Sequence, residues 1–234
     1  MRLRRKKNLE EKVENASVNL LARDGDAFFK HPDKETAFKI DIKSVFPSGK
    51  INLEIGCGKG TFCSEMAKRH PEENFIGVEK LTNVLYSALE KNLQLENNLK
   101  YINCDAQNLH FFLPEGCISK IYLNFSCPFP KNAYANRRLT NSKFLKIYEI
   151  IGDENLTIEQ KTDSDGLWEY SLEEYQNNGW EIIDKCWDIY SDDNYISKRQ
   201  IQTEFEQKFV GLGKPIHYIL AKRKPKKNIK YLNF

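Results

Sequence analysis

Three acidic residues in the first half of the chain stand at or near the ends of short apolar runs. Glu54 lies just ahead of a glycine-rich turn, and Glu79 and Asp105 close the next two runs. If these runs are parallel strands, their carboxyl ends meet at one edge of a sheet, where ligands bind. An anion at this edge would repel a phosphate and attract an ammonium group. The carboxylates therefore favour a cofactor that carries positive charge, such as S-adenosylmethionine.

The glycine-rich turn separates an alternating strand pattern from a helical one. Residues 51–55 alternate, Gly56, Gly58 and Gly60 follow at every second position, and a helical repeat begins at Phe62. This order places backbone N–H groups and a helix N-terminus in front of a ligand. Taken alone the turn is weak evidence, because Gly-x-Gly-x-Gly differs from the dinucleotide fingerprint and also occurs in plain tight turns. We expect Gly56 and Gly58 to border the cofactor.

The two later acids strengthen this interpretation. Glu79 lies about 20 residues after the glycines, where a carboxylate commonly reads ribose hydroxyls. Asp105 could accept a hydrogen bond from an adenine amine, or it could cap the helix that follows. We favour the cofactor contact, since three successive runs carry a carboxylate at the same edge.

A stiff loop rich in proline and aromatic residues follows the fourth run, at residues 124–131. Proline fixes φ, and Phe129 offers a flat face on which a base can stack. Lys131, Arg137 and Arg138 supply positive charge for phosphates. The position of this loop, one strand beyond the cofactor pocket, favours a site for a substrate base over a purely structural loop.

The elements that must position these residues alternate between strand and helix. This order predicts an α/β, Rossmann-like fold with a mostly parallel seven-stranded sheet, an antiparallel edge hairpin and helices on both faces. We expect a basic N-terminal arm at 1–47, one domain at 48–224 and a basic tail at 225–234. The predicted strands are 51–55, 74–79, 99–105, 118–125, 156–161, 180–190 and 216–221; the predicted helices are 61–70, 84–93, 144–151 and one from about 165 to Gly179.

Charge is unevenly placed along the 234 residues, although the net charge is only +3. Of the 36 basic residues, 11 lie near the two ends of the chain. The remaining 25 basic residues stand against 33 acidic ones, so the body of the chain is acidic. Basic ends around an acidic body suit a polyanion such as RNA, and they equally suit plain solvated ends. The 11 are Arg2, Arg4, Arg5, Lys6, Lys7, Lys222, Arg223, Lys224, Lys226, Lys227 and Lys230.

The six cysteines form no Cys-x-x-Cys pair, and the four histidines do not cluster with them. We therefore expect reduced thiols, with no metal site and no disulfide framework. The N-terminus lacks the apolar core of a signal peptide, and no run approaches the ~18 apolar residues of a membrane span. These features predict a cytoplasmic protein that does not contact a membrane.

Four further motifs occur in a fixed order. They are residues 124–131 (NFSCPFPK), 137–139 (RRL), 161–163 (KTD) and 203–206 (TEFE). Together with the glycine turn, from Leu53 to Lys222, they resemble the bacterial tRNA (guanine-N7-)-methyltransferase family. The resemblance implies a class I methyltransferase fold, S-adenosylmethionine as methyl donor, tRNA as partner and guanosine 46 of the variable loop as acceptor. The sequence leaves open whether the protein is a monomer or a homodimer.

The resemblance also implies a role for individual residues. The segment 133–138 would lie against the RNA. Cofactor contacts would be Glu54, Glu79, Asp105 and Cys127, and substrate contacts would be Lys131, Asp163, Thr203, Glu204, Phe205 and Glu206.

The chain departs from the family pattern at its chemical centre. Cys127 stands where the family has its catalytic aspartate, and Phe129 replaces a tryptophan. Guanine N7 presents a lone pair and bears no proton, so methyl transfer needs alignment more than a general base. We therefore expect methyltransferase activity to persist, with Asp163 accepting hydrogen bonds from the guanine N1–H and N2–H₂ groups.

Two other classes of protein compete with this hypothesis. RNA 5-methylcytosine transferases use a thiolate nucleophile, but their cysteine typically follows a proline, whereas Cys127 precedes Pro128. A tRNA-binding homologue that lost catalysis with the aspartate is the second alternative. The carboxylates at the three strand ends argue against it, since a plain RNA binder gains nothing from anions that face a polyanion.

Overall fold

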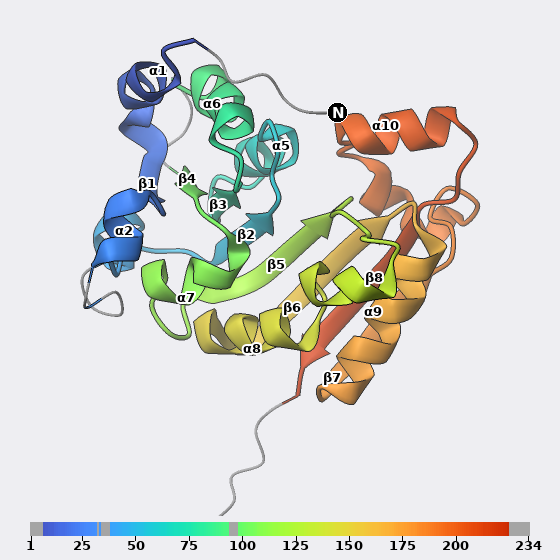
Figure 1. Cartoon of the computed structure of the whole chain (residues 1–234). Helices are drawn as coiled ribbons and strands as arrows, with labels where there is room; N and C mark the ends of the chain where they lie inside the picture. The colour runs from blue at the N-terminus through green and yellow to red at the C-terminus, as the bar shows by residue number, and fades with distance from the viewer. Residues whose placement is uncertain (1–6, 32, 34–37, 94–97, 225–234) are drawn as a thin grey trace, which may run out of the picture.

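The computed structural model describes residues 7–31, 33, 38–93 and 98–224 (Figure 1). Within these residues an eight-stranded sheet has the order β1-β4-β3-β2-β5-β6-β8-β7. The strands from β1 to β6 in that order run parallel, and β8 pairs antiparallel with both β6 and β7. The strands are β1 (Leu20–Arg23), β2 (Ile51–Ile55), β3 (Asn74–Val78), β4 (Leu99–Asn103), β5 (Ile118–Asn124), β6 (Gly152–Thr162), β7 (Trp180–Cys186) and β8 (His217–Arg223).

Helices cover both faces of the sheet, because the crossovers between parallel strands place them there. One face carries α1 (Leu9–Asn15), α5 (Thr61–Arg69) and α6 (Thr82–Lys91), and the other carries α7 (Leu109–Phe112), α8 (Ser142–Ile151) and α9 (Asp165–Asn177) (Figure 1). Every residue of β2 and β3 is buried between these layers. Each face has its own apolar cluster, so the central strands are held from both sides.

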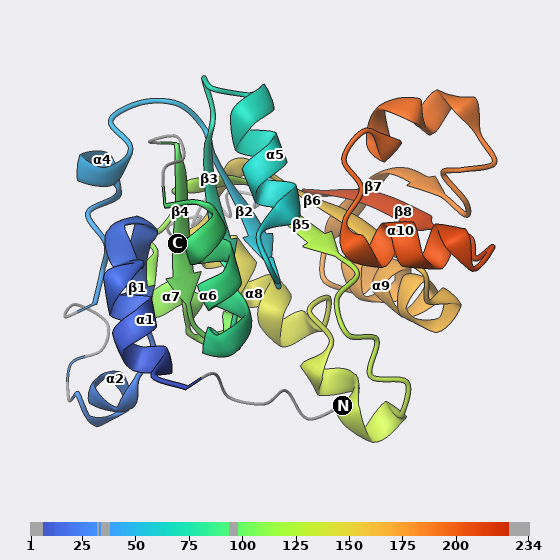
Figure 2. The same ribbon diagram turned by 90° about the horizontal axis from the view of Figure 1, so that it is seen from above.

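The last α-helix of the described residues lies near the carboxyl ends of the parallel strands. It is α10 (Glu204–Gly211), and both views place α5 between α6 and α10 (Figures 1 and 2). The Thr61 hydroxyl at the start of α5 donates a hydrogen bond to Glu204 Oε1 at 3.0 Å. The last predicted motif is therefore beside the glycine turn, although 143 residues separate the two partners.

The strand count differs from the expected seven, because β1 lies in the segment that we expected to be an irregular arm. It pairs with β4 through Leu20 opposite Tyr101 and Ala22 opposite Ile102. A four-residue strand whose side chains are all half-buried gives no measurable alternation in the sequence. The same segment also contains α1, α2 (Asp26–Lys30) and α4 (Ile42–Val45). The division of the chain at 47 and 224 stays a prediction, and the tail 225–234 lies outside the described residues.

Candidate functional site

The glycine turn after β2 has a backbone that other residues adopt only with strain. Gly56, Gly58 and Gly60 have φ values of 81°, 59° and 74°, which glycine reaches without a steric penalty. A Cβ placed on Gly56 or Gly58 would meet nothing within 4 Å, whereas one on Gly60 would lie 2.6 Å from the Tyr101 hydroxyl. The first two glycines therefore border open space that a ligand can approach, and the third serves close packing.

Glu54 is a buried carboxylate beneath this turn, with 4% of its surface exposed. It accepts hydrogen bonds from the Asn124 side-chain amide at 3.0 Å and from the Cys63 backbone N–H at 3.2 Å. Burial disfavours its charged form and raises the pKa of Glu54 to about 7, against the lowering effect of these hydrogen bonds. A cation beside Glu54 would lower this pKa again and favour the ionised carboxylate. A carboxylate that responds in this way suits a site for an ammonium group.

Glu79, just after β3, is joined directly to the turn. Its Oε2 accepts a hydrogen bond from the Gly58 N–H at 3.2 Å, and its Oε1 accepts one from the Leu81 N–H at 2.8 Å. Burial raises the pKa of this carboxyl as well. Glu79 thus contacts the glycine turn itself, and Glu54, on the neighbouring strand, contacts the first turn of the helix that follows it.

Asp105, just after β4, caps a short 3₁₀ helix through the Gln107 N–H at 3.1 Å. Its second oxygen forms an ion pair with Lys80 at 2.6 Å. The backbone N–H of Asp105 donates to Asp24 Oδ2 at 2.8 Å, and Asp24 also accepts from the Asn108 amide at 2.9 Å. Asp24 follows strand β1, which the sequence did not predict, and Asp24 was therefore not among the expected site residues. The capping role is present, and a cofactor contact of Asp105 stays a prediction.

These features fit S-adenosylmethionine. Glycines at positive φ leave the backbone open, and carboxylates of the type that accept from an ammonium, a ribose diol and an adenine amine stand around them. The residues that would hold the cofactor are Glu54, Gly56, Gly58, Glu79 and Asp105.

The loop after β5 contains two non-glycine residues with positive φ, Phe125 at 51° and Phe129 at 41°. Between them, Cys127 is exposed. Lys131 and Arg137 are exposed too, and the Arg137 guanidinium lies 4.9 Å from the centre of the Tyr134 ring. Both side chains are therefore accessible to a polyanion on the outer surface of the loop.

Arg138 does not share this position, although it follows Arg137 directly. Only 6% of it is exposed. Its Nε and Nη2 donate hydrogen bonds to the carbonyls of Pro128 and Phe129, each at 3.0 Å. We expected Arg138 to contact RNA, but its side chain points into the protein.

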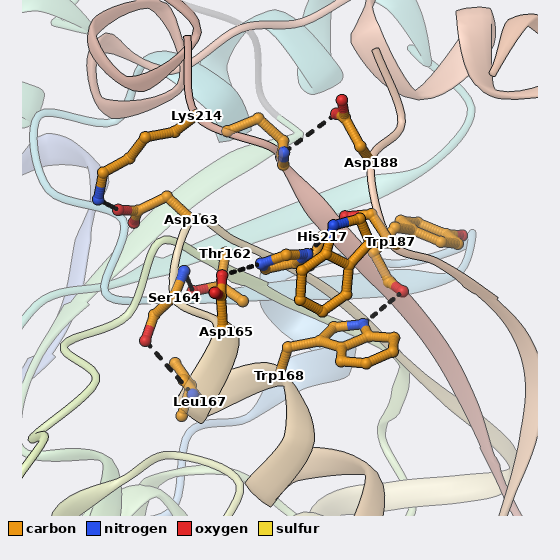
Figure 3. A network of polar contacts seen from close by, with 12 residues as sticks. Thr162, Asp163, Ser164, Asp165, Leu167, Trp168, Trp187, Asp188, Lys214 and His217 are labelled. Carbon is orange, nitrogen blue, oxygen red and sulfur yellow. Dashed lines mark hydrogen bonds and ion pairs between the residues drawn. The ribbon is translucent and has the colours of Figure 1, made fainter. Parts of the chain in front are cut away.

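The turn after β6 carries Asp163, whose carboxylate forms an ion pair with Lys214 at 2.7 Å (Figure 3). Asp165, at the start of α9, contacts Nε2 of the fully buried His217, and the other ring nitrogen of His217 contacts the Trp187 carbonyl. These contacts fix the backbone around Asp163. The Lys214 side chain is the more exposed partner of this pair, at 47% against 17% for Asp163.

The 203–206 motif divides between the surface and the interior. Thr203 caps α10 by accepting the Glu206 N–H at 3.1 Å, and Phe205 is 56% exposed. Glu206 is fully buried, where it forms an ion pair with Lys161 at 2.9 Å and accepts from the Tyr190 hydroxyl at 3.1 Å. Burial raises the pKa of Glu206 despite the lysine. We expected Glu206 at the substrate; its carboxylate instead joins α10 to β6.

All six cysteines are free thiols. Among the described residues, no group of three or more His, Cys, Asp or Glu side chains could hold a metal ion. In the same part of the chain, no helix is long and apolar enough to cross a membrane.

Comparison with known proteins agrees with this geometry. A family model described as "Putative methyltransferase" matches residues 48–219. The "tRNA (guanine-N(7)-)-methyltransferase" of Mesoplasma florum is 40% identical over 95% of this chain and 99% of its own length. The protein of that name from Limosilactobacillus reuteri is 42% identical over 81% of this chain and 89% of its own length.

Solved structures support the fold. The 16S rRNA methyltransferase KamB superposes with a TM-score of 0.60 at 12% identity, covering 79% of this chain and 93% of its own. A structure described as an antibiotic-related methyltransferase gives a TM-score of 0.59 at 13% identity, over 78% and 92% of the two chains. At these identities the likeness concerns the fold, whereas the sequence relatives define the family. The chain belongs to the tRNA (guanine-N(7)-)-methyltransferase family.

Proposed function

We propose that this protein transfers the methyl group of S-adenosylmethionine to N7 of guanosine 46 in tRNA. The observation that carries the proposal is an open glycine turn with two carboxylates beside it. Glu79 accepts the Gly58 N–H, and Glu54, two residues ahead of Gly56, accepts the Cys63 N–H in the first turn of α5, with the 124–131 loop next along the sheet. The names of relatives that cover 95% and 81% of this chain support N7 of a guanine in tRNA as the acceptor, and position 46 is what the family resemblance implies. As a tRNA-modifying enzyme the protein would act in the cytoplasm, as a monomer or a homodimer.

The proposed cofactor supplies a methyl group activated by a positively charged sulfur. The chain's own part is to bind and orient it. Glu54 would hold the ammonium group, Glu79 the ribose hydroxyls and Asp105 the adenine amine. Because the pKa of Glu54 is raised to about 7, the arrival of a cation would also release a proton from it.

The acceptor needs alignment and charge stabilisation. N7 of guanine carries its lone pair in the ring plane, so no base has to remove a proton before transfer. Phe129 offers a face for stacking, and the Asp163 carboxylate would accept from N1–H and N2–H₂ once Lys214 moves away. Lys131 and Arg137 would contact phosphates of the same RNA.

Cys127 lacks the carboxylate of the family's aspartate. That carboxylate would stabilise the cationic product and help to position the donor amine. Glu54 remains as a carboxylate in the pocket, and Phe129 keeps the stacking surface. We therefore infer a slower enzyme of the same specificity.

The test uses the full chain, labelled S-adenosylmethionine and unmodified tRNA transcripts, with nucleoside analysis by mass spectrometry. We expect 7-methylguanosine in a transcript with G46 and none in a matched transcript with A46. Cofactor and tRNA binding without product would indicate the non-catalytic homologue, and 5-methylcytidine would indicate the thiolate chemistry. Either result contradicts the proposal.

A further inference from the structure

We propose that Arg138 is a positioning residue that fixes the 124–131 loop from inside the protein and does not bind RNA. The proposal rests on the function proposed above, in which this loop presents the acceptor base. It separates two adjacent arginines that share a motif: Arg137 faces outward, and Arg138 is 6% exposed.

The guanidinium of Arg138 is held on three sides. Two of its N–H groups donate to consecutive carbonyls, Pro128 O and Phe129 O, at 3.0 Å each. Its plane lies over the Tyr170 ring, 4.3 Å from the ring centre. Two parallel donors and a flat face for stacking are properties of arginine that lysine lacks.

The backbone of Arg138 is anchored as well, so the side chain starts from a fixed point. Its N–H donates to Ala135 O at 3.1 Å, and its carbonyl accepts from the Asn141 N–H at 2.9 Å. Asn141 caps α8 and donates its side-chain amide to the Tyr170 hydroxyl at 2.8 Å. The loop is therefore tied, through one guanidinium, to the start of α8 and to α9.

The loop needs such a tie because of its own composition. Pro128 and Pro130 have no N–H to donate, so the backbone at these two positions can form hydrogen bonds only through its carbonyl oxygens. Phe129 has a φ of 41°, a conformation that an aromatic residue keeps only when its surroundings enforce it. Arg138 binds the carbonyls on both sides of the Phe129 amide nitrogen and Cα, so it constrains the strained residue itself.

The orientation of the Phe129 ring follows from this constraint. Without the guanidinium, the backbone at Phe129 can relax to negative φ, which turns the ring away from its present direction. A base stacked on that ring would lose its alignment with the cofactor, and misalignment lowers the rate of transfer more than the affinity for RNA.

The first experiment compares Arg138→Ala with the matched control Arg137→Ala in tRNA binding over a series of salt concentrations. Arg137→Ala should reduce the slope of log affinity against log salt by about 0.7–0.9, the range for one lost phosphate contact on single-stranded or duplex nucleic acid. Arg138→Ala should leave the slope at the wild-type value. A slope reduced by Arg138→Ala as much as by Arg137→Ala, with the transfer rate at saturating tRNA unchanged, would overturn the proposal.

The second experiment measures the single-turnover rate of methyl transfer at saturating tRNA and cofactor. Arg138→Ala should lower the rate by about ten- to hundredfold, the range that matches the loss of one enforced backbone conformation. Added guanidinium ion, well below denaturing concentrations, should restore part of the rate. Arg138→Lys should remain slow although it keeps the charge; wild-type rates in Arg138→Lys would contradict the need for a planar two-donor group.

The third experiment keeps the proposal testable if the wild-type protein shows no transfer at all. Amide hydrogen exchange across residues 125–131 should be faster in Arg138→Ala than in wild type, and unchanged in Arg137→Ala. Tyr170→Leu, which removes the ring face, should share the faster exchange, while Tyr170→Phe should keep the wild-type protection. Equal cofactor affinity in all variants shows that they are folded. Unchanged exchange in Arg138→Ala would refute the positioning role whatever the activity of the enzyme.

Discussion

Replacing Glu54 with glutamine should stabilise the protein and weaken its cofactor binding at the same time. One pKa unit corresponds to about 1.4 kcal/mol, so raising the pKa of Glu54 from 4.5 to about 7 makes its ionised form cost the folded state about 3 kcal/mol. Glutamine removes that cost without changing the shape of the side chain. The Asn124 amide, which now donates to Glu54 Oε1, can rotate so that its oxygen accepts from the new amide.

The sign of the effect depends on pH. Between pH 4.5 and about 7 the folded state holds a proton on Glu54 that the unfolded state has lost, so stability from this group rises as pH falls through that window. The gain from Glu54→Gln should be about 3 kcal/mol at pH 8 and about 1 kcal/mol at pH 5.5. Urea unfolding at the two pH values measures it. The matched control is Glu72→Gln, whose exposed side chain should give no gain at either pH.

The same variant should bind S-adenosylmethionine about 10- to 100-fold more weakly by calorimetric titration, the usual worth of one charge-assisted hydrogen bond. In the wild type, affinity should fall as the pH drops below about 7, because a protonated Glu54 no longer attracts an ammonium. In the variant this pH dependence should be flat. A glutamine variant with wild-type stability at pH 8 and wild-type cofactor affinity would refute the reasoning, since Glu54 would then be neither a costly buried anion nor a cofactor contact.

Three other substitutions test the rest of the site. Cys127→Asp should raise the rate of N7 methylation, measured by nucleoside analysis, because it restores a charge beside the cationic product; a loss of activity would show that the position is misassigned. Glu206→Leu should lower the free energy of unfolding, measured in urea, by about 3–5 kcal/mol, because it leaves Lys161 charged and buried. The double variant Lys161→Met/Glu206→Leu should be less destabilised than Glu206→Leu or Lys161→Met alone, and strict additivity of the two single effects would contradict a coupled pair. Asp24→Ala should weaken cofactor binding severalfold in calorimetry by releasing the backbone at Asp105, with Asp24→Asn as the milder control.

Much of the fold follows from the sequence because its central strands are buried on both faces. Such strands are short apolar runs, and the residues that end them must lie at one edge of the sheet. That rule placed Glu54 and Glu79 at the same edge of the sheet. In the structure Glu79 contacts the glycine turn, and Glu54 contacts the start of the helix that follows the turn. It failed for β1, since four half-buried residues do not form a recognisable run. Asp24 directly follows β1, so it was not predicted either.

The direction of individual side chains could not be predicted. Arg137 and Arg138 are identical in type and adjacent, and tertiary contacts decide which of them turns inward. Those of Arg138 are the carbonyls of Pro128 and Phe129 and the Tyr170 ring. Glu206 shows the same limit, because its partner Lys161 is 45 residues away and belongs to another motif. A motif indicates which residues matter, and tertiary contacts then decide whether each one meets the substrate or supports its neighbours.

Strand β1 also has a consequence for self-association. Without β1, β4 would be an edge strand with unpaired N–H and C=O groups, and its side chains are mostly buried and apolar. Such an edge is a template for pairing with a second chain. Two other features disfavour pairing of a second chain with the opposite edge strand, β7. Its register is irregular near Ile182, and every second side chain is exposed. Strand β1 therefore covers an edge on which a second copy could pair, and we expect an enzyme shortened past Asp24 to self-associate even where its catalytic residues are intact.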